Sequence, residues 1–590
     1  MKRCPECRRD YYDDSLLYCL DDDSALLEGP ASRDEQQTAI LSEPGAVATG
    51  FSADEPQTAI LHSTAAPGDA PTRAQIHTTE RASVLPSTPV ELPKATGLDK
   101  RLFIAPFALV VIVFGGILGY RYFSSSSSGT INSIAVLPFQ NTGGNSDADY
   151  LSDGLTESLI YRLSQLTDLK VSPTSSVFRY KGKETDLQTV AKELGVDSVM
   201  TGRLTQRGDD LTISVNLVDT RNGKSLWGEQ YERKLSDILN TQREMASEIA
   251  KKLQLKLSGE EKGLTKNYTD SSEAYQLYLK GRYFWNKRTS ESLQQAVVYF
   301  EQAIKKDSNF ALAYSVIAES YTLYPNYSVA LPLDCMPKAK EAALRAIELD
   351  DTLAEPHVAL GIYYADFAWN QPKAEQEFRR AIELNPNYAT AHQQFGIECL
   401  TAMGRFDEAI AEGNRAVELD PLSPIISADF GNIYLRARRF DEAKAQLEHA
   451  LALDPNFFVT NWFLGLVYQA KGKYDDAVAS FRRSVELSDN PWSKALLATA
   501  LAKAGKRDEA VKLVSELQAE ASRRVVSSAS LAMAYGAIGD KDKAFEYLNK
   551  EVNERNARPP VFAYYVIWDD LRDDPRFAAI LRRVETEKLD

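Results

Sequence analysis

Three of the five cysteines lie within the first 20 residues, at a spacing that suits metal binding. Cys4 and Cys7 form a CxxC pair, and Cys19 follows in the stretch CLDD, which ends at Asp22. The tight turn of a CxxC pair lets both thiolates face one ion, and a carboxylate is an acceptable zinc ligand. We therefore predict a closed structural zinc site formed by Cys4, Cys7, Cys19 and Asp22. A knuckle without metal and a redox pair remain as alternatives, although the flanking sequence lacks the βαβ pattern of a thioredoxin-type CxxC.

The pattern CPxC…YCxxD resembles the short zinc-ribbon modules at the N-termini of bacterial proteins. The resemblance implies a zinc-ribbon-like motif over residues 1–28 that docks partners and carries out no catalysis. Asp22 stands where such modules usually have a fourth cysteine. Bound metal would stabilise a unit that is too small to fold alone.

Residues 29–100 are rich in Ala, Thr, Ser, Pro, Glu and Gln and poor in large apolar residues, which predicts a disordered linker. Within the linker the motif QTAIL occurs twice, at Gln37–Leu41 and Gln57–Leu61. Thr38 and Thr58, each with Leu at +3, are similar to the phosphothreonine sites that forkhead-associated domains read. Drift within a low-complexity tract is the simpler explanation of the repetition, and both interpretations stay open.

A stretch without charged residues, residues 102–120, follows the linker. About 19 helical residues span roughly 28 Å, close to the hydrocarbon thickness of a bilayer, so we predict one transmembrane helix. Lys94, Lys100 and Arg101 precede it, whereas Arg121 alone follows closely. The positive-inside rule then predicts a single-pass protein of the bacterial inner membrane, with a cytoplasmic N-terminus and periplasmic or extracytoplasmic C-terminal domains.

Residues 130–260 alternate strand and helix patterns and predict a small α/β domain with a mixed sheet. Turns are expected at Gly208-Asp209-Asp210 and at Arg221-Asn222-Gly223, between three predicted strands. The order IAVLPF…DYLSDGLTESLI…KELGVDSVMTGRL…LVDTRNGKSLWGEQYER resembles the N-terminal α/β domain of TolB-like periplasmic proteins. That resemblance implies an extracytoplasmic interaction domain without catalysis.

Residues 273–556 repeat with a period of 34 to 35 residues, and each unit contains two helix patterns. Small residues are required where the two helices of a unit cross, and a proline ends each unit. This is the tetratricopeptide pattern, and it predicts an all-α superhelix of about eight units, capped by residues 557–590. The recurring small residues are Gly361, Gly396, Gly431, Gly465, Ala374, Ala409, Ala443 and Ala477.

The resemblance to tetratricopeptide proteins implies that the superhelix binds peptides or protein surfaces in a concave groove. Counting from the recurring glycine, the predicted groove positions are Gln393, Asn432, Arg436, Trp462 and Gln469. The family's carboxylate clamp needs Lys and Asn at set positions, but Ala428 occupies the Lys position before Asn432, which argues against a clamp. Trp462 is as consistent with packing as with binding.

The composition of the 590 residues favours a protein that binds other proteins. A net charge of -15 argues against nucleic acid as a partner, and no catalytic or phosphate-binding motif predicts an enzyme or a small-molecule substrate. The order of domains resembles that of membrane-spanning regulators and receptor kinases. We therefore expect either a relay from extracytoplasmic partners to the cytoplasmic knuckle or an envelope assembly scaffold. Cys335 and Cys399 are expected to be buried small hydrophobes.

Overall fold

The computed structural model describes residues 2–3, 10–11, 27–28, 131–144, 148–166, 168–253, 264–556 and 559–589. The chain divides into two compact units, Met1–Leu109 and Val110–Asp590. In the first unit the described residues form three short antiparallel strands in the order β2-β1-β3, with bounds β1 Lys2–Arg3, β2 Asp10–Tyr11 and β3 Leu27–Glu28.

Several predictions fall on residues outside the described part of the chain. These are the zinc ligands Cys4, Cys7, Cys19 and Asp22, the threonines Thr38 and Thr58, and the transmembrane helix over 102–120. Among the residues that are described, none of the helices has the length and apolar character needed to cross a membrane. The membrane segment and the zinc site therefore remain predictions.

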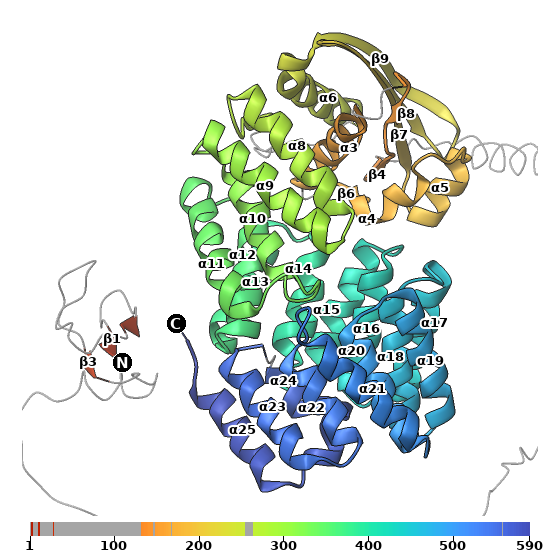
Figure 1. Ribbon diagram of the computed structural model, residues 1–590. Coiled ribbons are helices and arrows are strands. Elements are labelled where there is room, and N and C mark those ends of the chain that lie inside the picture. Colours follow the sequence, from red (N-terminus) through yellow and green to blue (C-terminus); the bar gives the residue numbers. More distant parts are fainter. Residues whose placement is uncertain are drawn as a thin grey trace, which may run out of the picture. The chain divides into compact units, whose positions relative to one another are not determined.

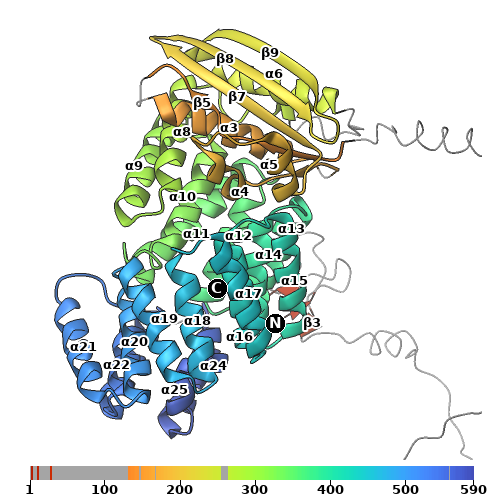
Figure 2. The ribbon, with the colours of Figure 1, turned by 90° about the vertical axis from the view of Figure 1, so that its right-hand side faces the viewer.

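The second unit begins with an α/β domain whose sheet has the strand order β6-β4-β7-β8-β9, and β5 pairs with β7. β4 runs parallel to β6 and β7, whereas β7, β8 and β9 are antiparallel, so the sheet is mixed as predicted. Figure 1 shows α3 and α6 beside this sheet, and Figure 2 shows the long strands β7, β8 and β9 side by side. The strands are β4 Ser133–Val136, β5 Gln140–Asn141, β6 Lys170–Val171, β7 Ser198–Arg207, β8 Asp210–Asp219 and β9 Lys224–Lys234. The helices are α3 Asp149–Ser164, α4 Thr174–Val177, η2 Phe178–Tyr180, α5 Leu187–Leu194, η3 Leu235–Asp237 and α6 Ile238–Lys252.

Two glycines allow the tight turns between the antiparallel strands. Gly208 has φ +61° and Gly223 has φ +70°, a left-handed conformation that side chains disfavour. Both turns lie where the sequence predicted them. Along β8, residues alternate between buried and more exposed positions, as expected for a strand with one face on a core.

Residues Ser272 to Asn553 form eight consecutive helix pairs. We call the first helix of each unit helix A and the second helix B. The bounds are α8 Ser272–Asn286 and α9 Ser290–Lys306; α10 Ala311–Leu323 and α11 Pro332–Leu349; α12 Glu355–Ile362, η4 Tyr363–Phe367 and α13 Gln371–Leu384; α14 Ala389–Gln394, η5 Phe395–Leu400 and α15 Phe406–Leu419. Units 5 to 8 are α16 Pro424–Arg436 and α17 Phe440–Leu453; α18 Phe458–Ala470 and α19 Tyr474–Leu487; α20 Pro491–Lys503 and α21 Arg507–Glu520; α22 Ser528–Ala537 and α23 Lys541–Asn553.

At three of its four positions, the recurring glycine of helix A lies against a large side chain of helix B. A Cβ at Gly361 would lie 2.7 Å from the ring of Phe378, and one at Gly465 would lie 2.5 Å from the ring of Phe481. At Gly431 the neighbour is Leu447, 2.6 Å away. The absence of a side chain is therefore what brings the two helices of a unit together.

We expect Gly465→Ala to destabilise the repeats by about 2 kcal/mol. The added methyl group overlaps the fully buried ring of Phe481, and this cost outweighs the gain in helix propensity. Gly536→Ala is the matched control, because a Cβ there meets its nearest neighbours at ordinary contact distances of 3.7 Å and more. Urea denaturation of both variants measures the difference. A Gly465→Ala variant as stable as the Gly536→Ala variant would contradict this packing argument.

After unit 8 the chain forms α24 Pro559–Tyr564, η6 Val566–Leu571 and α25 Pro575–Thr586. These elements share a hydrophobic core with helices of units 5 to 8, and Trp568 is completely buried in it. Figure 1 shows α24 and α25 next to α22 and α23. The described part of the predicted C-terminal cap therefore packs on the last repeats.

Candidate interaction surface

Four of the five predicted groove positions are buried. Gln393, Asn432, Arg436 and Gln469 have exposed fractions of 6%, 2%, 4% and 8%, and Trp462 is half-buried. Gln393 donates to Asp429 Oδ2 at 2.7 Å, and Gln469 Oε1 accepts from Thr499 at 3.1 Å. Trp462 packs against Trp492, with 5.8 Å between the ring centroids. Whether these positions bind a partner remains a prediction, but they are largely inaccessible in this conformation.

Arg436 shows what covers one of these positions. Its guanidinium lies 5.6 Å from the ring of Tyr565, and its Nη1 donates to Ile397 O at 2.5 Å and to Thr401 Oγ1 at 2.9 Å. Tyr565 belongs to residues 559–571, which comprise α24 and η6 and which we call the covering segment. η6 also contacts α18 and α22. The chain's own C-terminal part therefore lies over helix A residues of units 5, 6 and 8.

Three successive A-to-B turns also contact C-terminal residues. Trp369, Gly404 and Arg438 stand 35 and 34 residues apart, each with a positive φ of 58°, 71° and 58°. Glycine is the usual residue in this conformation, and Gly472, Gly505 and Gly539 occupy the same position in the later units. Trp369 and Arg438 are thus locally unfavourable choices, and both make contacts outside their own unit.

Each of these turns has its own partner. Arg555 stacks over Trp369 at 4.4 Å from the ring centroid, and Arg438 forms a 2.9 Å ion pair with Asp569. At Gly404 a Cβ would lie 2.9 Å from Tyr564 Oη, so a side chain there would displace the Tyr564 hydroxyl.

The C-terminal residues of the described chain form hydrogen bonds with unit 3. The Leu589 N–H donates to Ala368 O at 2.8 Å, and Asn370 Nδ2 donates to Leu589 O at 3.3 Å. Arg555 donates to Phe367 O at 3.2 Å and to Glu587 O at 2.8 Å. Residues almost 220 apart in sequence are joined in this way by a few polar contacts.

The α/β domain and the repeats share one hydrophobic core, which extends from the sheet into α8 and α10. Leu279 packs so closely on Gly154 that a Cβ there would lie 2.7 Å from Leu279 Cδ2. The Tyr275 hydroxyl donates to Gln242 Oε1 at 2.5 Å and lies 2.9 Å from Ser158 Oγ, so one side chain links α8, α6 and α3.

Polar contacts tie the α/β domain to repeats that lie far away in sequence. The hydroxyls of Ser175 and Ser176 donate to the two carboxylate oxygens of Asp420, and Arg179 Nη2 donates to Leu453 O at 3.0 Å. Burial raises the pKa of Asp420, although both serine hydroxyls act to lower it. The domain therefore contacts unit 1 and also the ends of units 4 and 5.

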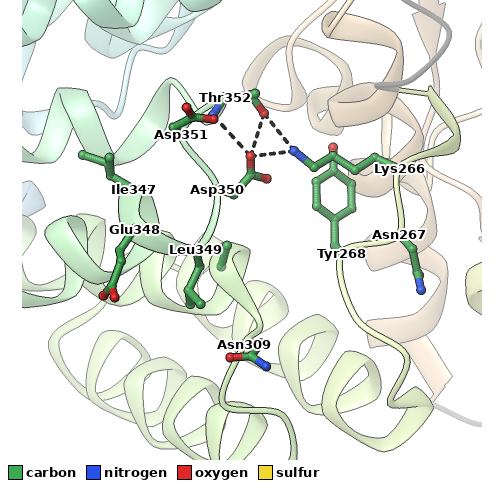
Figure 3. Close-up of a pocket in the computed structure, with 11 residues that line it drawn as sticks. Lys266, Asn267, Tyr268, Asn309, Ile347, Glu348, Leu349, Asp350, Asp351 and Thr352 are labelled. Atoms are coloured by element: carbon green, nitrogen blue, oxygen red, sulfur yellow. Dashed lines mark hydrogen bonds and ion pairs between the residues drawn. The ribbon is translucent and has the colours of Figure 1, made fainter.

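A pocket of about 490 Å³ lies where the segment between α6 and α8 meets the end of α11. Figure 3 shows Lys266 reaching Asp350 and Thr352, with distances of 2.5 Å from Lys266 Nζ to Asp350 Oδ1 and 2.9 Å to Thr352 Oγ1. Tyr268 stands beside this ion pair. Because Lys266 and Asp350 already neutralise each other, we interpret this contact as a structural link between the segment that joins α6 to α8 and the end of α11.

A second group of charges involves helices of units 2 and 3. Burial raises the pKa of Glu319, and burial together with the charge of Glu319 raises the pKa of Glu355 to about 7. One carboxylate oxygen of Glu355 is buried without a hydrogen-bond partner in the described structure. Burial, followed by the charges of Glu319 and Glu355, raises the pKa of Tyr388 well above its usual value.

One expectation on cysteine chemistry concerns the repeats. Cys335 and Cys399 are buried as predicted, and burial raises the pKa of each thiol to about 12. Thiols of such high pKa are unreactive at neutral pH. Within the described ranges no cluster of three His, Cys, Asp or Glu side chains is arranged to hold a metal ion.

Sequence reasoning missed the covering segment and the contacts of Trp369 and Arg438. One signal was available, because glycine recurs at this turn position in units 4, 6, 7 and 8 and gives way to Trp and Arg in units 3 and 5. A bulky residue at a position that favours glycine indicates a contact that compensates for it.

Helix pairs with this period define the class of protein, and comparison with known families agrees. Two tetratricopeptide repeat family models match residues 400–462 and 432–566. The chain therefore contains tetratricopeptide repeats in its C-terminal region, as predicted. A further family model, described as the second domain of HilA/YgeH-like transcriptional regulators, matches residues 130–251.

Individual relatives match part of the chain. It is 32% identical over 234 residues to putative adenylate cyclase 3 of Rhizobium meliloti (strain 1021), covering 39% of this chain and 40% of that protein. It is 26% identical over 240 residues to the transcriptional regulator HilA of Salmonella typhimurium (strain LT2), covering 40% of this chain and 41% of that protein. The chain thus spans about 40% of the length of these curated relatives.

Among solved structures, the chain is similar to pilF of Pseudomonas aeruginosa, with 20% identity and a TM-score of 0.28. The match covers 35% of this chain and 92% of the pilF chain. YrrB, a TPR protein with an unusual peptide-binding site, has 19% identity and a TM-score of 0.23, covering 32% and 92%.

Proposed function

We propose that this chain is a single-pass membrane protein whose α/β domain and repeats bind protein partners as one unit. The observation that carries the proposal is the shared core between the α/β domain and the first repeats, together with the Asp420 and Leu453 contacts. A partner bound to the repeats would act on a body in which the α/β domain cannot reorient freely. The TolB-like resemblance supports the same interpretation.

The names of the relatives suggest how such a unit is used. One relative is a transcriptional regulator and another is a putative adenylate cyclase. Each match covers about 40% of this chain and about 40% of the relative. We infer that a shared regulatory part is combined with different output parts. In this chain the output would be the zinc knuckle of Cys4, Cys7, Cys19 and Asp22. Together with phosphorylated Thr38 and Thr58 of the linker, the knuckle would recruit a partner. No catalytic step, nucleic acid or small-molecule substrate is part of the proposal.

The membrane topology of the chain tests the proposed relay. Alkaline phosphatase and a fluorescent protein are fused separately after Asp590, and we expect active phosphatase and a dark fluorophore. The reverse result would place the repeats with the N-terminus and would overturn the relay. A scrambled linker that leaves the physiological response unchanged would instead favour the alternative, an envelope assembly scaffold. Zinc is tested by metal analysis of the full chain, with loss of the metal expected in Cys7→Ser.

A further inference from the structure

The covering segment presents a specific chemistry to the repeats. It places Tyr565 over Arg436, and it places Tyr564 against Phe406, with ring centroids 5.3 Å apart. It then places two carboxylates on two cations, Asp569 on Arg438 at 2.9 Å and Asp570 on Lys503 at 2.7 Å. The surface beneath therefore accepts aromatic residues followed by acidic ones. We call Arg436, Arg438 and Lys503 the cationic row.

The covering segment satisfies this surface only in part. Asn432 Oδ1 and Arg436 Nε are buried without a hydrogen-bond partner in the described structure, and so is Trp568 Nε1 of the segment itself. Buried polar groups normally have a partner, and Tyr565 leaves the Nε of Arg436 beneath it without one.

The polar attachments of the segment are weak. In the Arg438–Asp569 pair the two side chains are 50% and 40% exposed, and in the Lys503–Asp570 pair they are 29% and 64% exposed. Ion pairs this open to solvent contribute little to stability. Ionic contacts to the cationic row can therefore break at small cost.

The segment is also folded internally, which lets it move as one piece. Phe562 stacks on Trp568 with 5.4 Å between centroids and packs on Phe577 of α25 at 6.4 Å. Arg572 donates to Ala563 O at 2.7 Å and to Tyr565 O at 3.0 Å, which holds α24 and η6 together. Displacement would keep these internal contacts, but it would expose the apolar side chains that the segment shares with the core of units 5 to 8, Trp568 among them. A partner that displaces the segment must therefore cover this apolar surface with aromatic residues of its own.

We propose that the cationic row and the helix A residues around it bind an acidic peptide bearing aromatic residues, and that the covering segment occupies this site in cis until a partner displaces it. The inference rests on the proposed function, since it names the partner chemistry and the regulation of the same repeat surface. It also explains why Arg436, one of the predicted binding residues, lies beneath Tyr565.

The test uses the full-length chain in detergent micelles and a fluorescent peptide of residues 562–574 as the probe. Asp569→Lys/Asp570→Lys replaces both attractions with repulsion and leaves the repeat surface unchanged. We expect this variant to bind the peptide about tenfold more tightly than the unaltered chain, with faster amide exchange over residues 562–571. Asp573→Lys makes half of this charge change at an exposed position for which the described structure shows no ion pair, and its affinity should equal that of the unaltered chain.

Arg438→Gly supplies a second variant that keeps its turn, because glycine suits the φ of +58° there. Combined with Asp569→Lys/Asp570→Lys, Arg438→Gly should weaken peptide binding about fivefold. Equal binding by all variants would overturn the inference, as would faster exchange without any binding. Neither result touches the proposed function, whose topology is decided independently by the fusion experiment.

Discussion

Glu157→Ala is expected to destabilise the junction between the α/β domain and the repeats by about 3 kcal/mol. Glu157 on α3 accepts a 2.9 Å hydrogen bond from Arg282 Nε on α8, and it also accepts from Asn286. The two side chains of the ion pair are 7% and 20% exposed. Burial acts to lower the pKa of Arg282, but Glu157 reverses this effect and the pKa is raised. Removing Glu157 leaves a largely buried guanidinium without its carboxylate.

Urea denaturation and amide exchange of α3 and α8 measure this effect. Glu244→Ala is the matched control, because its pair with Arg233 is 48% and 37% exposed and should contribute under about 1 kcal/mol. The double variant Glu157→Leu/Arg282→Met should recover much of the lost stability, since it removes both charges. Equal costs for Glu157→Ala and Glu244→Ala would contradict a buried, structurally required pair.

Glu551→Gln is expected to make the last repeat more stable above neutral pH. Glu551 on α23 is 3% exposed and accepts a 2.7 Å hydrogen bond from the Ala529 N–H at the start of α22. Burial, aided by the charge of Glu554, raises its pKa from 4.5 to about 8. The folded state therefore holds the proton more tightly than the unfolded state, and the stabilisation is fully present below pH 4.5. It is lost progressively as the pH rises from 4.5 to 8.

The loss has an upper bound of about 5 kcal/mol, at roughly 1.4 kcal/mol for each pKa unit. Glutamine keeps an acceptor for Ala529 and carries no proton to lose. Thermal unfolding midpoints measured from pH 4.5 to 9 should therefore diverge between the unaltered chain and the variant up to pH 8 and then run parallel. Glu546→Gln removes a charge from the exposed face of the same helix and serves as control. Parallel curves throughout would show that Glu551 does not titrate in this window.

Local features of the sequence were sufficient for much of the fold. Gly208 and Gly223 identified two turns, because few other residues adopt their positive φ. The 34 to 35 residue period located the helix pairs, since units 3 to 6 repeat a glycine at the same position of helix A. Burial of Cys335 and Cys399 also followed from their position within helical, apolar sequence.

The candidate site depended on contacts that no local pattern encodes. Arg436 was placed on helix A by its phase, but it lies beneath Tyr565 of the covering segment, more than 120 positions later. Residues that far apart are brought together by the summed curvature of many helix pairs. The side chains that meet there are Tyr564, Tyr565 and Asp569 on one side and Gly404, Arg436 and Arg438 on the other.

By itself, the sequence determined the α/β domain, the repeat architecture and the acidic, repeat-rich character that favours protein partners. Periodicity and turn residues act over a few residues, so one chain is enough to see them. Only the tertiary structure decided that the α/β domain and the repeats share a core and that the C-terminal segment covers Arg436, one of the predicted groove positions. Both depend on surfaces that become complementary once the repeats have stacked.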